Sequence, residues 1–392
     1  MSARPIPRSV VILGFVSMFM DISSEMIHSL LPVFMVSVLG VSALSVGIIE
    51  GIAEATASIT KVFSGVVSDW IGKRKPLVLL GYGMAALTKP LFPLAQSVEA
   101  ILIARFIDRI GKGIRGAPRD ALITDLVTKD QHGAAFGLRQ SMDTVGAFAG
   151  PALAMGLMFF FMDDYRMVFW FAVIPAFIAV GCIIFGVSEP ERKQTGKKAP
   201  FPIQKSELIK LEKPFWLVVT FAAAFTLARF SEAFLLLRAD SLGLSAAYIP
   251  AILIAMNVVY AGSAYPVGRL SDRIGKYALL AGGIVLLIIA DLILAFCSSL
   301  FWVFAGSALW GLHMGMTQGL LSALVADTAP PELRGTAFGM FHLMTGISLL
   351  IASALAGWLW TAHGPEETFL AGVAFAAISL VGFAWIFRKY LK

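Results

Sequence analysis

Apolar segments long enough to cross a lipid bilayer recur along the entire chain. A membrane-spanning helix needs about 20 predominantly apolar residues, and short polar loops separate the segments that meet this requirement. We therefore expect an all-α membrane protein with twelve transmembrane helices. The expected spans lie at roughly residues 9–39, 43–68, 77–96, 98–126, 132–161, 167–187, 214–238, 245–268, 277–298, 300–327, 334–361 and 366–388.

The composition excludes an ordinary soluble domain. Hydrophobic residues make up 58% of the chain and charged residues only 14%, an apolar share above that of soluble domains. Cys182 and Cys297 both lie within apolar segments, so we expect neither a disulfide framework nor a metal site. Arg4 and Arg8 precede an apolar stretch too long for the core of a signal peptide, so we expect the first span to be retained.

The basic residues indicate how the spans are oriented. Cytoplasmic loops of membrane proteins carry an excess of Lys and Arg. With both termini and the central polar stretch in the cytoplasm, that side holds roughly twenty Lys and Arg and the opposite side about two. We therefore expect a multi-pass protein of a bacterial-type inner membrane with cytoplasmic N- and C-termini. The same clustering accounts for the net charge of +6 without nucleic acid as a partner.

The chain contains an internal repeat. Asp69 corresponds to Asp272, and Asp125 corresponds to Asp327 at nearly the same offset. The residues after the second pair also match, namely Gly133, Phe136 and Gly137 with Gly335, Phe338 and Gly339. We therefore expect two parallel repeats of six spans each. The predicted domains are residues 1–187 and 214–392, joined by a cytoplasmic linker at 188–213.

The most distinctive motif lies between the second and third spans and returns in the second half. It reads Gly65-Val-Val-Ser-Asp69-Trp-Ile-Gly72-Lys73-Arg74-Lys75, and its echo reads Gly268-Arg-Leu-Ser-Asp272-Arg-Ile-Gly275-Lys276. The loop resembles the Gly-x-x-x-Asp-x-x-Gly-Arg-Arg-Lys motif of the major facilitator superfamily, with Lys73 in place of the first Arg. This resemblance covers essentially the whole chain and implies two pseudo-symmetric six-helix bundles around a central cavity.

Two further segments resemble motifs of the same family. Residues 104–113 resemble its fourth-span motif with a buried Arg, although Asp108 and Arg109 stand where Gln and Gly are commoner. The fifth span resembles the motif associated with the antiporter branch, at Gly146, Gly150 and Pro151. The resemblance therefore implies a secondary transporter that exports its substrate.

The loop motif and its echo are expected to act as a conformational latch. Glycines allow helices to approach closely, and Asp69 near a helix end can accept hydrogen bonds from exposed backbone N–H groups and attract a cation. A latch between the two halves would hold the outward-open state; alternatively, the basic cluster only sets the topology. The expected latch residues are Gly65, Asp69, Gly72, Lys73, Arg74, Gly268, Asp272 and Gly275.

Three ionisable residues of the first span share one helix face. Asp21, Glu25 and His28 are spaced i, i+4 and i+7. Ionisable groups in the membrane are costly and indicate function by default. We expect at least one of Asp21 and Glu25 to carry the coupling proton or to bind substrate, and His28 to contact substrate. The alternatives are a carboxylate permanently paired with a base, and a metal-binding trio.

The fourth span supplies the expected partners of these acids. A basic stripe recurs at three- and four-residue spacing, at Arg105, Arg109, Lys112, Arg115 and Arg119. A carboxylate that loses its proton could then pair with Arg105, while Arg109 and Lys112 contact substrate. We expect the two inner members to contact lipid headgroups or the cytoplasmic ends of helices. The same surplus of cations is compatible with an anionic substrate.

The second half offers only single polar residues as candidates. The expected substrate contacts are Arg229, Glu232, Asn257, His313 and Gln318. Alternatively, Arg229 and Glu232 satisfy each other, and the remaining three make hydrogen-bonded helix contacts. In the fifth span, Arg139 and Asp143 are four residues apart and are expected to form an internal pair.

The sequence therefore favours a monomeric transporter that works by alternating access. No Gly-x-x-x-x-Gly-Lys-Ser/Thr phosphate loop is present, so we expect neither an enzyme nor a cofactor, with the proton as the coupling ion. The first hypothesis is proton-coupled efflux of a small organic or amphiphilic compound. The alternatives are a carrier or exchanger of small anionic metabolites, and a membrane sensor that does not transport.

Overall fold

The computed structural model describes residues 6–71, 73–128, 132–189, 211–296, 298–330 and 333–387. Within its helices, only the backbone is described at residues 65, 66, 69, 70, 132–134, 137, 265, 269, 272, 273 and 334–336. Over these ranges the chain is helical between its turns and contains no strand, which confirms the expected all-α fold. Most of the predicted linker at 188–213 lies outside them.

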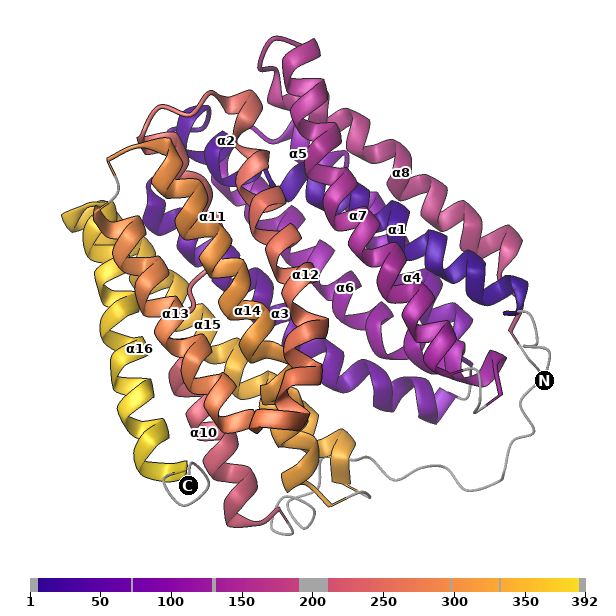
Figure 1. The fold of residues 1–392 in the computed structure, drawn as a ribbon. Coiled ribbons are helices and arrows are strands. Elements are labelled where there is room, and N and C mark those ends of the chain that lie inside the picture. Colours follow the sequence, from indigo (N-terminus) through magenta and orange to yellow (C-terminus); the bar gives the residue numbers. More distant parts are fainter. Residues whose placement is uncertain are drawn as a thin grey trace. The chain divides into compact units, whose positions relative to one another are not determined.

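The chain forms two compact units, which Figure 1 shows as one ribbon coloured along the sequence. The first unit comprises Met1–His28 and Thr56–Pro202, and the second comprises Ser29–Ala55 and Ile203–Lys392. Residues 29–55 therefore pack with the second unit, although they precede the linker. The division into domains at 1–187 and 214–392 stays a prediction.

The helices of the first unit follow the order of the predicted spans. Helix α3 (Ala43–Ile71) enters this unit at Thr56. The others are α1 (Arg8–His28), α4 (Lys75–Thr88), α5 (Leu91–Leu94), α6 (Val98–Leu126), α7 (His132–Phe160) and α8 (Tyr165–Gly186). Helix α1 packs against α7 and α8, and α4 packs against α6 and α8. In Figure 1, α1, α7 and α8 lie side by side.

The second unit contains α2 (Leu31–Ser37), the start of α3 and all helices after the linker. These are α10 (Lys213–Thr226), α11 (Ala233–Ser241), the 3₁₀ turn η2 (Ala246–Tyr248), α12 (Pro250–Ile274), α13 (Lys276–Phe296), α14 (Leu300–Thr328), α15 (Arg334–His363) and α16 (Pro365–Phe387). Helix α13 packs between α14 and α16, and α14 also packs against α12.

The described helices account for the predicted spans. Nine helical stretches of the described chain are long and apolar enough to cross a membrane. Helices α6 and α14, with 29 residues each, are also long enough, because an α-helix rises about 1.5 Å per residue. The seventh span is divided between α10 and α11.

The first and seventh spans are broken at corresponding positions of the repeat. We expected continuous helices at 9–39 and 214–238, but α1 ends at His28 and α10 ends at Thr226. Pro32 lies in the first turn of α2, where its missing N–H costs nothing. In the second break, Ser231 Oγ accepts a hydrogen bond from the Ala233 N–H at 3.2 Å. Such interrupted helices place polar backbone groups inside the bundle.

Two ion pairs are repeated at the same offset in the two halves. The Arg74 Nε atom lies 2.6 Å from the Asp125 carboxylate, and the Lys276 Nζ atom lies 2.5 Å from that of Asp327. The Glu189 carboxylate also accepts a hydrogen bond from the Arg74 backbone N–H. Part of each loop motif is therefore tied to an acid in its own half.

Close glycine contacts join residues 29–55 to the rest of the second unit. A Cβ atom at Gly47 would lie 2.1 Å from the Ser353 carbonyl oxygen, and one at Gly357 would lie 2.5 Å from that of Ala43. The Leu44 N–H donates a hydrogen bond to Thr361 Oγ1 at 3.1 Å. Small residues thus let the start of α3 cross α15 at backbone distance, as is common between membrane helices.

The interior of the first unit contains a buried ion pair. The Lys89 Nζ atom lies 3.0 Å from Asp108 Oδ1, and the two side chains are only 2% and 6% exposed. Lys89 also donates a hydrogen bond to Ser24 Oγ at 3.0 Å, and Arg109 Nε lies 3.8 Å from Asp108 Oδ2. The carboxylate of Asp108 therefore compensates two buried cations.

Asp108→Asn is expected to destabilise the protein strongly. It removes the carboxylate that pairs with Lys89 at 3.0 Å, and breaking a buried pair in this way costs about 3–5 kcal/mol. The double variant Lys89→Met/Asp108→Asn should recover part of the loss because it also removes one cation. The measurement is thermal unfolding in detergent, with Glu99→Gln, an exposed acid of the same helix, as the control. A melting temperature for Asp108→Asn equal to that of the control would contradict the assignment.

Candidate functional site

The acidic face of α1 packs directly on the glycine motif of α7. A Cβ atom at Gly146 would lie 2.8 Å from the Asp21 Cβ atom, and one at Gly150 would lie 2.6 Å from the Glu25 Cβ atom. Main-chain oxygens of α1 lie equally close, at 2.8 and 2.9 Å from these two positions. The fifth-span motif therefore fixes the distance between α7 and the two acids. Both acids are half-buried.

His28 and Arg105 meet at the end of α1. Arg105 Nη2 donates a hydrogen bond to His28 Nδ1 at 3.2 Å. The sequence placed these two residues at the same depth, with Arg105 as a partner for the acids of α1. The structure adds the imidazole as a direct partner of that guanidinium. Because His28 is the last residue of α1, this contact lies beside the break in the first span.

Asp21 lies within the electrostatic field of a second charged cluster, formed by α6 and α7. It interacts with the carboxylate of Asp143 and with the cations Arg115, Lys112 and Arg119. Asp21 is therefore repelled by one carboxylate and attracted by three cations. Lys112 is exposed, whereas Arg115 is buried.

The inner arginines of α6 contact side chains of neighbouring helices. The Arg115 guanidinium lies 4.4 Å from the centre of the Tyr82 ring, and Arg119 donates a hydrogen bond to Ser17 Oγ at 2.7 Å. Arg119 also donates to the Tyr82 hydroxyl at 3.3 Å and pairs with Asp120. These two cations therefore hold α6 to α1 and α4.

The expected internal pair on α7 is present and extends to α6. Arg139 Nη1 lies 3.3 Å from Asp143 Oδ2 and 3.5 Å from Asp120 Oδ1. Lys61 of α3 also interacts electrostatically with Asp120. The acids and cations of three helices thus form one network next to Asp21.

The candidates of the second half are distributed over several helices. Arg229 and Glu232 lie in the break between α10 and α11. Gln318 accepts a hydrogen bond from the Tyr260 hydroxyl at 3.2 Å, which joins α12 to α14. His313 is fully buried and packs edge-to-face on Trp310, with ring centres 5.0 Å apart. Asn257 lies half-buried on α12. Gln318 therefore makes a contact between helices, whereas the ring contact of His313 with Trp310 lies within α14.

Several buried charges were not singled out from the sequence. Lys89, Glu50 and Asp291 all lie within predicted spans, and their side chains are 2% exposed or less. Lys89 and Asp291 are single charges in otherwise apolar segments, which is itself a signal of function or pairing. The sequence carries that signal for these two residues, but it does not identify the partner on another helix.

The latch residues are only partly described. Gly72 and the side chains of Asp69 and Asp272 lie outside the described part of the chain. Gly275 ends α12 with a φ of 88°, a conformation that favours glycine. Lys73 is exposed. Within the described residues, no group of three or more His, Cys, Asp and Glu is placed to hold a metal ion.

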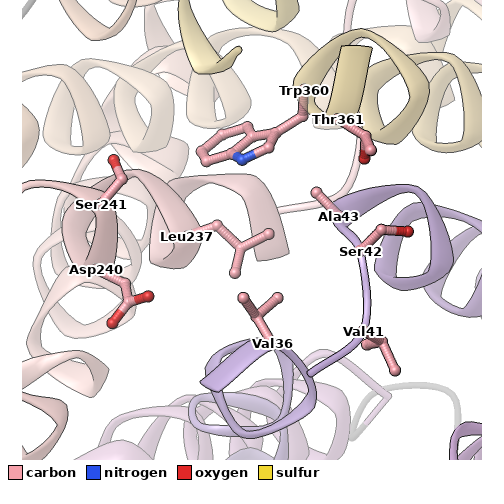
Figure 2. A pocket seen from close by; sticks show the side chains of 9 residues that line it. All are labelled: Val36, Val41, Ser42, Ala43, Leu237, Asp240, Ser241, Trp360 and Thr361. Atoms are coloured by element: carbon pink, nitrogen blue, oxygen red, sulfur yellow. The ribbon is translucent and has the colours of Figure 1, made fainter. Parts of the chain in front are cut away.

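A hollow of about 250 Å³ lies in the second unit, where α2, α3, α11 and α15 meet. Figure 2 shows Val36 and Leu237 pointing toward each other in this hollow, with the Trp360 indole facing them. Asp240 and Thr361 also line it. None of the predicted substrate residues does, so this hollow is separate from the candidate site.

Comparisons with known proteins agree with this architecture. The family model for the Major Facilitator Superfamily matches residues 13–237 and 230–391. An uncharacterized MFS-type transporter of Methanocaldococcus jannaschii is 35% identical over 382 residues, which cover 96% of this chain and 94% of that protein. The multidrug resistance protein MdtH of Klebsiella pneumoniae is 24% identical over 386 residues, with 96% and 92% covered.

Solved structures show the same fold. The crystal structure of a mutant of the nucleoside transporter NupG aligns with a TM-score of 0.81 at 17% identity, and the alignment covers 98% of this chain and 100% of that one. The family match spans nearly the whole chain, and these relatives are transporters and not enzymes. The chain therefore belongs to the major facilitator superfamily of membrane transporters.

Proposed function

We propose that the protein exports a small organic or amphiphilic compound in exchange for protons. The observation that carries this proposal is the pair of half-buried acids on α1, which are held against the glycine motif of α7. Of the two, Asp21 interacts with charged groups of α6 and α7. A reversible proton carrier needs surroundings that tolerate both its charged and its neutral form. The likeness to a multidrug resistance protein supports the same direction of transport.

The charges around Asp21 explain how a proton could be coupled to substrate. When the acid is ionised, the cations of α6 stabilise it, and when it is neutral, its repulsion from Asp143 disappears. A substrate that enters next to these groups changes that balance and favours one protonation state. Proton and substrate then compete for the same face of α1, which is the physical basis of exchange. This cycle needs only a single chain and no ATP.

A carrier of small anionic metabolites is the second candidate. Its support is the basic stripe of α6, of which Lys112 is exposed and Arg105 contacts His28. Against it, Arg109 and Arg119 already pair with the neighbouring Asp108 and Asp120. These pairs reduce the positive charge available to an anion. A membrane sensor without transport is the third candidate.

The first test measures proton movement in inverted membrane vesicles with an acidic lumen. Cationic, neutral and anionic compounds are added in turn, and lumenal pH is followed with a fluorescent dye. Release of protons by a cationic or neutral compound supports exchange and identifies the substrate class. Accumulation of an anion without proton movement favours the second candidate, and binding without any flux favours a sensor.

Glu25→Gln is expected to remove coupled transport without loss of folding. The amide keeps the size of the side chain and its packing on Gly150, but it cannot exchange a proton. Proton release should fall by about tenfold or more. Glu99→Gln, at the exposed start of α6, is the matched control and should transport normally. Normal transport in Glu25→Gln would show that Glu25 does not carry the proton and would shift this role to Asp21.

Gly150→Ala is expected to slow transport because its new methyl group must push α7 away from Glu25. The added Cβ atom would meet the Glu25 Cβ atom at 2.6 Å and the Ile22 carbonyl oxygen at 2.9 Å. A displacement of this kind can cost about tenfold or more in rate. Gly156→Ala is the control on the same helix, because no heavy atom lies within 4 Å of its added Cβ. Equal initial rates in the two variants would show that the contact does not matter for transport.

A further inference from the structure

A buried carboxyl group of α13 lies inside the second unit and is distant in sequence from the acids of α1. Asp291 of α13 has 0% of its surface exposed. Its Oδ1 atom accepts a hydrogen bond from Trp310 Nε1 of α14 at 2.8 Å. Its Oδ2 atom is also buried and has no hydrogen-bond partner among the described residues. One half of this carboxyl group is therefore unsatisfied.

The groups around Oδ2 are apolar or neutral. A Cβ atom at Gly372 of α16 would lie 2.4 Å from Oδ2 and 3.2 Å from the Phe230 ring. Phe230, which is 4% exposed, lies in the break between α10 and α11 and contacts the Trp310 ring at 5.9 Å between centres. The carboxyl is thus enclosed by a glycine, a phenyl ring and an indole.

The ionisable groups on the packed helices do not compensate a charge on Asp291. On α14, His313 packs edge-to-face on the Trp310 indole and is acted on by the cation Arg229 of the break. On α12, the Tyr260 hydroxyl donates to Gln318. No ion pair to Asp291 is present among the described residues, and Trp310 is the polar group that acts on it.

The repeat makes this arrangement informative. Asp291 and Trp310 occupy the positions of Lys89 and Asp108 at the same residue offset that relates Asp125 to Asp327. In the first half, these positions hold an ion pair, with nitrogen and oxygen 3.0 Å apart. In the second half, the cation is replaced by the acid and the acid by an indole. The second half therefore has a buried acid where the first half has a neutralised pair.

A carboxylate at this place would be an uncompensated charge in an apolar interior. Such a group costs several kcal/mol or more, and it takes up a proton in preference to remaining ionised. An indole N–H can stabilise either form because it donates to Oδ1 in both. Because no cationic side chain pairs with Asp291 among the described residues, a proton on Oδ2 would neutralise this carboxylate.

We propose that Asp291 is a proton-binding site of the second half, closed by Phe230 at the break of the seventh span. Binding forms the Oδ2–H bond of a neutral acid, and release returns the proton to water and leaves a carboxylate that keeps the Trp310 hydrogen bond. Rearrangement of the break moves Phe230 and opens the carboxyl to water. Coupling of this proton to transport rests on the proposed function, whereas its binding does not.

The test is infrared titration of the purified protein in lipid, from about pH 5 to about pH 10, without any substrate. Asp291→Asn keeps the size of the side chain, its neutral form and the acceptor for Trp310, so the variant is expected to fold. Wild type should show the carbonyl stretch of a protonated carboxyl that disappears on alkaline titration. This band should be absent in Asp291→Asn and present in Asp240→Asn, a half-buried acid of the same unit.

A second variant assigns the band without removing the acid. Trp310→Phe deletes the N–H donor to Oδ1, so the carbonyl band should shift to higher wavenumber and remain titratable. Proton uptake measured by a pH jump should be greater in wild type than in Asp291→Asn by about one proton per chain. If either Asp291→Asn or Trp310→Phe folds poorly, the other variant still identifies the group that titrates.

Two results would overturn the proposal. A band that persists unchanged in Asp291→Asn shows that another residue carries it, and a band that does not titrate shows a fixed structural acid. The outcome is separate from that of the vesicle assay. If the band titrates but no compound moves protons, the site stands and the exchange function fails. If exchange occurs and the band does not titrate, the acids of α1 act alone.

Discussion

A charge buried in a membrane span must be neutralised inside the protein, and this constraint shapes both halves of the structure. Neither lipid nor water can compensate an ion in the interior of a helix bundle, so each buried charge needs a partner on a neighbouring helix or a proton. Lys89 pairs with Asp108 of α6, whereas Arg119 pairs with Asp120 of its own helix and donates hydrogen bonds to Ser17 of α1 and Tyr82 of α4. The contacts that hold the helices of the first unit together are therefore also those that make its charges tolerable.

A comparison of the two repeats shows that buried charges are accommodated differently in the two halves. Near the loop motifs, both halves keep an ion pair, Arg74 with Asp125 and Lys276 with Asp327. Deeper in the bundle, only the first half keeps one, and the second half holds Asp291 against an indole. Two halves with the same helix order thus carry different charges at the same place. This asymmetry underlies our proposal that each half responds to protons in its own way, although both share one fold.

The fold could be predicted from the sequence further than the site could. Spans and the repeat depend on hydropathy and motif spacing, which are local properties of the chain. Contacts depend on how each helix is rotated about its axis and where it breaks, and neither can be derived from such patterns. The motif indicated that Gly150 matters, but not that it meets Glu25. Likewise, Lys89 was indistinguishable from other single charges until its contact with Asp108 was seen.

The difference between fixed and exchangeable charges follows from how completely each acid is paired. Asp108 pairs with Lys89 at 3.0 Å and lies 3.8 Å from Arg109. Uptake of a proton would cost Lys89 its ion pair, so we assign Asp108 a structural role. Asp21 is acted on by cations and by the like charge of Asp143, which makes its two protonation states closer in free energy. The glycines of α7 hold Asp21 and Glu25 at a distance that packing alone determines. Ion pairs between helices therefore stabilise the bundle. The acids that are less completely paired, and that close helix packing holds in place, are the groups that we propose respond to protons and substrate.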